Sequence, residues 1–205
     1  MKNQATGWQT LCIKDRSRKF DTPLASNEYP PTKVSALASI LVGCNNKVVW
    51  IKVEGKGSFQ NSQGMKDFSR EMMNRGHREF VLDLKNCAVM DSTFMGTLAG
   101  MGLRLKELGQ GNLHVINSND RNTELLQNLG LDHLFDLNSS DLERNLHPGG
   151  VQELTPNALS KTDTAETMLE AHEALVEAAP ENEARFKDVL EYLKTDLHVT
   201  AGSEA

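Results

Sequence analysis

The sequence predicts an α/β protein, because strand patterns and helix patterns alternate over the middle of the chain. Short apolar runs are followed by segments in which apolar residues recur three and four positions apart. Glycines stand where these helical segments end, which is typical of helix termini. Such alternation favours parallel strands joined by right-handed crossovers. Two further amphipathic segments near the C-terminus predict a helical hairpin.

The predicted α/β domain occupies residues 38–137 and begins with two strands. Residues 38–42 are an apolar run, and Asn45-Asn46 predicts a turn. Residues 47–54 then alternate between two faces, with Val48, Trp50, Lys52 and Glu54 on the face away from the core. The buried face would carry Val49, Ile51 and Val53.

A helix is expected next, capped by Asn61 or Ser62 and ending near Asn74. Its apolar stripe is Met65, Phe68 and Met72. The near-continuous apolar run at 80–84 predicts a strand that is buried on both faces. Residues 86–91 are interpreted as a loop.

The rest of the domain repeats this pattern. A second helix is expected over residues 92–108, followed by a strand at 113–117. A third helix over 120–129, capped by Ser118 or Asn119, precedes a short edge strand within 134–137. On the second helix, Gly96 and Gly100 are four residues apart, which is best explained by close helix packing.

The two ends of the chain have a different character from the middle. Residues 1–37 show little periodicity and are predicted to be a flexible tail. Residues 138–161 are interpreted as a linker, and residues 199–205 as a disordered tail. Between them, residues 162–198 are predicted to form the hairpin. The whole C-terminal region, residues 138–205, carries 14 acidic and 5 basic residues. Two helices alone bury too little surface to be stable. The hairpin must therefore dock on the α/β domain, on a second copy or on a partner.

Composition excludes several classes of function. The net charge of −6 argues against a nucleic-acid-binding surface. No stretch approaches the roughly 18 apolar residues of a membrane span. The histidines lack the spacing of metal ligands, and Gly55-x-Gly57 lacks the rest of a dinucleotide motif, so we expect no metal and no cofactor. The three cysteines, Cys12, Cys44 and Cys87, are expected to be buried reduced thiols of a cytoplasmic protein.

Asp91 and Ser92 lie at the predicted start of the second helix, at the carboxyl end of a buried strand. Open α/β sheets place their functional sites at this edge. Both side chains are good helix caps, so a purely structural role is one interpretation. The other is phosphorylation of Ser92, because the unpaired amides and the dipole of a helix N-terminus favour a phosphate. The added negative charge would close a docking surface without unfolding the domain.

The segments Phe80-Val81-Leu82-Asp83-Leu84 and Val89-Met90-Asp91-Ser92-Thr93-Phe94-Met95-Gly96 resemble the STAS domain of bacterial anti-sigma factor antagonists. This resemblance implies a small mixed β-sheet with packed helices and a non-enzymatic regulatory protein. It implies that Ser92 is the phosphorylated serine, with Thr93 as second choice. The implied partners are an anti-sigma factor or switch-type serine kinase and a PP2C-type phosphatase. The chain departs from the family pattern at Phe94, where a glycine is usual.

The residues expected to bind the partner lie in two segments of the chain. They are Asp91, Ser92, Thr93, Met95 and Gly96 in the first segment and Ser58, Asn61 and Ser62 in the second. The second segment lacks the acidic residue that the family commonly has there. An alternative is a STAS scaffold in a larger signalling complex, in which the serine is never modified. A hydrolase using Ser92 is a third class, but the sequence has no G-x-S-x-G motif and places no His or Asp partner.

Overall fold

The computed structural model describes residues 39–45, 48–109, 111–137, 150–154 and 160–203. The predicted tail at 1–37, the second half of the turn at Asn45-Asn46 and most of the linker at 138–161 lie outside these residues. Among the described residues, no helix has the length and apolarity needed to cross a membrane.

The centre of the protein is a mixed six-stranded sheet with the order β5-β4-β3-β2-β1-β6. Strands β2 to β5 pair in parallel, whereas β1 pairs antiparallel with both β2 and β6. The strands are β1 Ser39–Asn45, β2 Val48–Gly57, β3 Glu79–Met90, β4 Asn112–Ile116, β5 Asp136–Leu137 and β6 Gln152–Leu154. The mixed sheet with packed helices is therefore confirmed.

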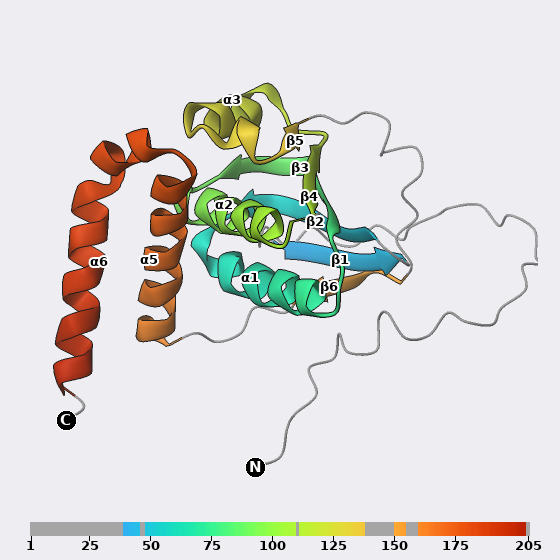
Figure 1. Cartoon of the computed structure of the whole chain (residues 1–205). Coiled ribbons are helices and arrows are strands. Elements are labelled where there is room, and N and C mark those ends of the chain that lie inside the picture. Colours follow the sequence, from blue (N-terminus) through green and yellow to red (C-terminus); the bar gives the residue numbers. More distant parts are fainter. Residues whose placement is uncertain (1–38, 46–47, 110, 138–149, 155–159, 204–205) are drawn as a thin grey trace, which may run out of the picture.

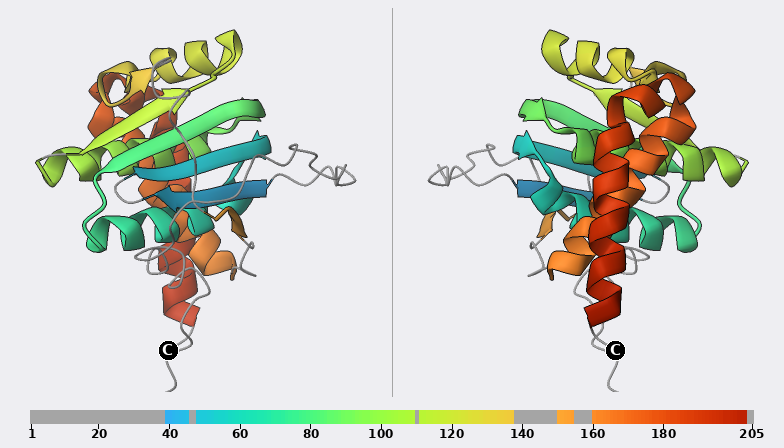
Figure 2. Two further views of the ribbon diagram at one scale, coloured as in Figure 1. Left: turned by 90° about the vertical axis from the view of Figure 1, so that its right-hand side faces the viewer. Right: turned by 90° about the vertical axis from the view of Figure 1, so that its left-hand side faces the viewer.

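Helices α1 and α2 lie side by side against the sheet, and the C-terminal hairpin packs beside them (Figure 1). Within the hairpin, α5 contacts the α/β domain and α6 is the outer helix (Figure 2). The helices are α1 Phe59–Asn74, α2 Ser92–Glu107, α3 Asp120–Asn128, α5 Lys161–Ala178 and α6 Glu183–Ser203, with short 3-10 turns η2 Leu131–His133 and η3 Pro180–Asn182.

The core lies between the sheet and the helices α1 and α2. The register places Ile51, Leu82 and Val115 side by side on three neighbouring strands, and all three are fully buried. The predicted stripe of α1 faces them, since Met65, Phe68 and Met72 are also fully buried. Flexible methionine side chains fill the space above these branched residues.

Strand β3 is longer than predicted, because residues 86–90 continue the strand instead of forming a loop. The polar side chains of Lys85 and Asn86 broke the apolar run in the sequence, and both are exposed. The backbone nevertheless stays paired with β2 through two register irregularities, as far as Gly57 opposite Met90. One irregularity lies at Gly55, which has a positive φ of 83°, but the continued pairing depends on the partner strand.

Helix α1 begins earlier than predicted, with Ser58 as its N-cap. The two residues proposed as caps, Asn61 and Ser62, lie inside the first turn. The Asn61 side-chain oxygen accepts a hydrogen bond from the Ser58 amide at 2.9 Å, and the Ser62 hydroxyl donates to the Ser58 carbonyl at 3.0 Å. The ends of α2 and α3 fall within one residue of the prediction, and Asn119 caps α3.

The C-terminal region corrects two expectations and decides a third point that the sequence left open. The predicted linker contains β6, which pairs with β1. Helix α6 runs to Ser203, where a disordered tail was expected from residue 199. Of the three docking places left open, the structure selects the chain's own α/β domain. The buried face of α5 includes Ala165, Ala171 and Ala178, while Met168, Leu169 and Val176 are only half-buried.

Cys44 and Cys87 are both buried, as predicted, whereas Cys12 lies outside the described residues. Burial raises the pKa of the Cys87 thiol above its usual value, so the reactive thiolate is scarce at neutral pH. We expect iodoacetamide at pH 8 to alkylate Cys87 at least about tenfold more slowly in the native protein than in urea. Peptide mass spectrometry over a time course measures this. Equal rates in both conditions would contradict the buried position.

Candidate functional site

Asp91 holds together the N-termini of two helices. One carboxylate oxygen accepts the Phe94 amide at 3.0 Å and so caps α2, while the other accepts the Phe59 amide at the start of α1 at 3.1 Å. The Asp91 amide itself donates to the Gly57 carbonyl at 3.0 Å, at the end of β2. A negative charge is stabilised at the positive end of a helix dipole. Asp91 therefore fixes the geometry in which Ser92 is presented.

Replacing Asp91 by alanine should lower the free energy of unfolding by about 1–2 kcal/mol, since two helix ends lose their acceptor. Asp91→Asn retains one acceptor oxygen without the charge, so its loss should be smaller. Urea denaturation followed by circular dichroism measures both variants. A stability of Asp91→Ala equal to that of the wild type would show that the carboxylate is not a cap in solution.

Ser92 is the first residue of α2 and is joined to the C-terminal hairpin. Its Oγ lies 3.0 Å from Nε2 of His172 on α5, and Nδ1 of the same ring lies 2.7 Å from the Met168 carbonyl oxygen. A carbonyl can only accept, so Nδ1 carries a proton, and in the neutral ring Nε2 accepts the proton of the Ser92 hydroxyl. His172 is only 4% exposed, and its ring packs edge-on against Phe186 of α6 with centroids 5.0 Å apart.

The Ser92–His172 pair has the spacing of a serine nucleophile and its base. The structure therefore supplies the histidine partner of Ser92 that the sequence did not locate, and a missing partner does not argue against a hydrolase. The argument against a hydrolase is instead the location of the pair, because the imidazole is buried between α5, α2 and α6. A groove of about 520 Å³ lies between α1, α2 and α5, and neither Ser92 nor His172 lines it. The pair joins α5 to α2.

His172 is the site residue that the sequence interpretation missed, because it stands at helical spacing among apolar residues such as Met168 and Leu175. A signal was present in the sequence. A histidine on the buried face of an amphipathic helix needs a polar partner, since buried polar side chains are nearly always hydrogen-bonded. The sequence could not show that Ser92, 80 residues earlier, supplies it.

The other predicted site residues are mostly buried. Thr93, Met95 and Gly96 lie on α2, and each is buried. Ser58 lies beside Asp91, because the following residue donates its amide to that carboxylate. Asn61 and Ser62 bond instead to the local backbone, with the Asn61 amide nitrogen donating to the Lys56 carbonyl at 3.1 Å. Partner binding through these residues stays a prediction.

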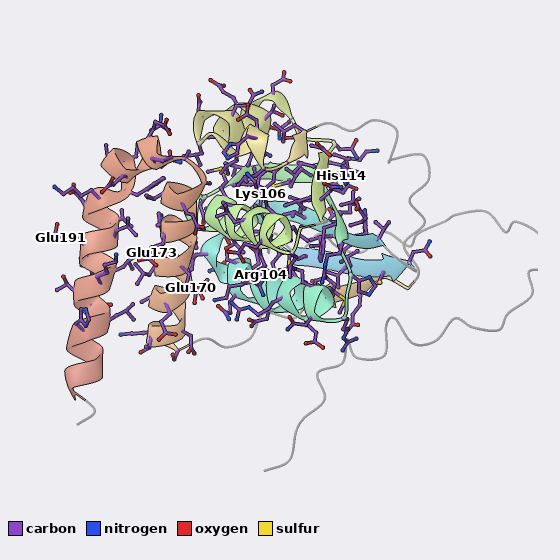
Figure 3. All side chains as sticks on the ribbon, viewed as in Figure 1. Arg104, Lys106, His114, Glu170, Glu173 and Glu191 are labelled. Atoms are coloured by element: carbon purple, nitrogen blue, oxygen red, sulfur yellow. The ribbon has the colours of Figure 1, made fainter. Side chains whose placement is uncertain are left out.

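The groove between α1, α2 and α5 carries both signs of charge. Lys66, Arg70 and Arg104 line it together with Glu107, Glu170 and Glu173, of which Arg104, Glu170 and Glu173 are labelled in Figure 3. Lys66 and Glu170 form an ion pair at 2.8 Å across it. Within the part of the chain that the structure describes, no group of three His, Cys, Asp or Glu side chains could hold a metal ion.

Comparison with solved structures finds similar chains at low sequence identity. An anti-sigma factor antagonist from Mycobacterium paratuberculosis is 16% identical, with a TM-score of 0.47, and the match covers 56% of this chain and 97% of that one. The Bacillus cell fate determinant SpoIIAA in its phosphorylated form is 16% identical, with a TM-score of 0.44, over 53% and 97%. The Thermotoga maritima protein TM1081 is 16% identical, with a TM-score of 0.45, over 62% and 96%. No curated protein matches the chain.

A family model matches the part of the chain that contains most of the sheet and the Asp91–Ser92 motif. The model of the STAS domain matches residues 39–147, which is more than half of the chain. Of the elements in the described residues, this range contains every strand but β6 and the helices α1, α2 and α3. The chain therefore belongs to the STAS domain family, to which it adds a C-terminal helical hairpin.

Proposed function

We propose that this chain is a cytoplasmic regulatory protein that acts as an anti-sigma factor antagonist through the surface around Ser92. The observation that supports it most is the position of Ser92, the first residue of α2, immediately after the Asp91 cap. SpoIIAA, which shares the fold, has been solved in unphosphorylated and phosphorylated forms. On this proposal an anti-sigma factor or switch-type serine kinase binds the surface, and a PP2C-type phosphatase restores it.

The electrostatics of the site support a switch. A phosphate on Ser92 adds about −1.5 to −2 charge next to the Asp91 carboxylate. The Asp91 oxygens already take up the Phe94 and Phe59 amides, so the phosphate would not be neutralised by those donors. The added charge would repel an acidic partner face, and an apolar partner face could cover it only at a cost in desolvation.

The test compares partner recovery for three variants of the full chain in its native cells. Ser92→Ala should recover an anti-sigma factor or switch-type kinase as well as the wild type. Ser92→Asp should lower the recovery of that protein by about tenfold or more, equivalent to about 1.4 kcal/mol. Ser118→Asp adds the same charge at the N-terminal side of α3 and should recover the partner normally. Equal recovery by Ser92→Ala and Ser92→Asp, or no protein of either class with Ser92→Ala, would overturn the proposal.

A second candidate is a STAS scaffold in a larger signalling complex, in which Ser92 is never modified. One observation favours it, namely that the Ser92 hydroxyl already has a partner in His172. On this alternative, Ser92→Ala and Ser92→Asp would assemble with the same proteins, and no phosphate would be found on Ser92 in native cells.

A further inference from the structure

Helix α5 packs directly against α2, the helix whose first residue is Ser92. A Cβ atom built on Gly96 would lie 2.2 Å from the Ala171 carbonyl oxygen, and one built on Gly100 would lie 3.7 Å from the Ala174 side chain. The two helices therefore touch backbone to backbone at this crossing. The contact explains why position 96 is a glycine, and it confirms the close packing predicted there. At Gly100 a Cβ would make only an ordinary contact with Ala174.

Polar contacts fix the hairpin at both ends of this crossing. Towards the start of α5, Glu170 pairs with Lys66 of α1, and the Thr167 hydroxyl donates to the Gln63 side chain. Beyond the end of α5, Asn182 donates to the Leu129 carbonyl at 3.0 Å and Arg185 to the Asn128 carbonyl at 2.7 Å. Together they specify one seated position in which His172 meets Ser92.

A phosphate on Ser92 is incompatible with this position. It removes the hydroxyl proton that Nε2 of His172 accepts, and its oxygens would occupy the space of the imidazole, 3.0 Å from Oγ. If the side chain turns the phosphate towards solvent instead, Nε2 of the buried ring is left without its donor, which is also unfavourable. Both arrangements weaken the seating of α5.

We propose that α5 and a phosphate on Ser92 exclude one another, so that the C-terminal hairpin is a built-in cover of the Ser92 surface. The hairpin shields Ser92 from a kinase while it is seated, and phosphorylation releases it. This proposal rests on the proposed regulatory role of Ser92 and adds to it a second state, in which the unmodified surface is covered by the chain itself. A partner that binds the unmodified surface must displace α5.

Hydrogen exchange in the full chain tests the exclusion, with phosphoserine installed at position 92 during translation. We expect the amides of residues 165–178 in α5 to exchange about tenfold or more faster than in the unmodified chain, while those of residues 81–84 in β3 keep their rates. Phosphoserine at position 118 is the matched control and should change neither segment. Exchange in α5 that is unchanged or slower would overturn the proposal, because the phosphate would then be accommodated or paired with a protonated His172. Equal acceleration in β3 would also overturn it, since α5 would not move separately.

A second pair of variants leaves Ser92 unmodified and acts from the hairpin side. Ala171→Asp places bulk and charge at the crossing with Gly96 and should accelerate exchange in α5 as the phosphate does. Ala184→Asp makes the same change at an exposed position of α6 and should have no effect. Slow exchange in Ala171→Asp would contradict the crossing itself. These experiments do not depend on whether Ser92 is phosphorylated in cells, because the phosphate is installed during translation and is not added by a kinase. Their failure would overturn the covering role of α5 but not the proposed phosphorylation of Ser92.

Discussion

Leu82→Ala should lower the free energy of unfolding by about 2–5 kcal/mol, the usual cost of emptying a fully buried leucine site. Leu82 lies in the middle of β3, between Ile51 of β2 and Val115 of β4, and it is 0% exposed. The surrounding strands are hydrogen-bonded on both sides and cannot collapse into the cavity. A protein of this size has only about 5–15 kcal/mol in total, so the loss is a large share of it.

Urea denaturation followed by circular dichroism measures this loss, and Val189→Ala is the control. Val189 lies on the outer helix α6 and is 40% exposed, so its truncation should change stability by about 0.5 kcal/mol or less. Two variants of equal stability would mean that β3 is not the centre of the sheet.

Gly96→Ala and Gly64→Ala should change stability in opposite directions. Alanine normally stabilises a helix interior by roughly 0.5–1 kcal/mol over glycine, and Gly64 on α1 has open space around its Cβ position. At Gly96 the new Cβ would lie 2.2 Å from the carbonyl oxygen of Ala171, which is backbone and cannot rotate away. The hairpin must shift, so we expect a loss of about 1–3 kcal/mol.

Thermal or urea denaturation of the two variants side by side reports the sign directly. Hydrogen exchange shows where the loss in Gly96→Ala falls, and it should be concentrated in α5 and α6 because those helices move away. A stabilising effect of Gly96→Ala similar to that of Gly64→Ala would mean that the close crossing of α2 and α5 does not persist in solution.

The sequence predicts the elements that depend on local chemistry. The stripe of Met65, Phe68 and Met72, the cap at Asp91 and the edge strand at β5 all follow from residues close together in the chain. These features need only helical spacing, capping preference or a short apolar run. The Asp91–Ser92 motif was found for the same reason, since its position at a strand-to-helix junction is a local property.

The sequence does not reveal features that depend on a distant partner. The extension of β3 through residues 86–90 exists because β2 continues beside it, and β6 exists because β1 offers an edge. An amphipathic stripe shows that the hairpin must be buried but not against which surface. The contact of His172 with Ser92 follows from that docking, so neither residue alone indicates it.

The regulatory role of Ser92 is tested most directly by the phosphorylation state of this residue in native cells. Trypsin cleavage after Lys85 and Arg104 yields one peptide, residues 86–104, that contains Ser92 with Thr93 and Thr97 as internal alternatives. Fragmentation of this peptide, from cells sampled through growth and stress, assigns any phosphate to a single residue. We expect a phosphate on Ser92 in at least one condition and its disappearance in a Ser92→Ala strain. A Ser92 that is unmodified in every condition, or a phosphate confined to Thr93 or Thr97, would contradict it.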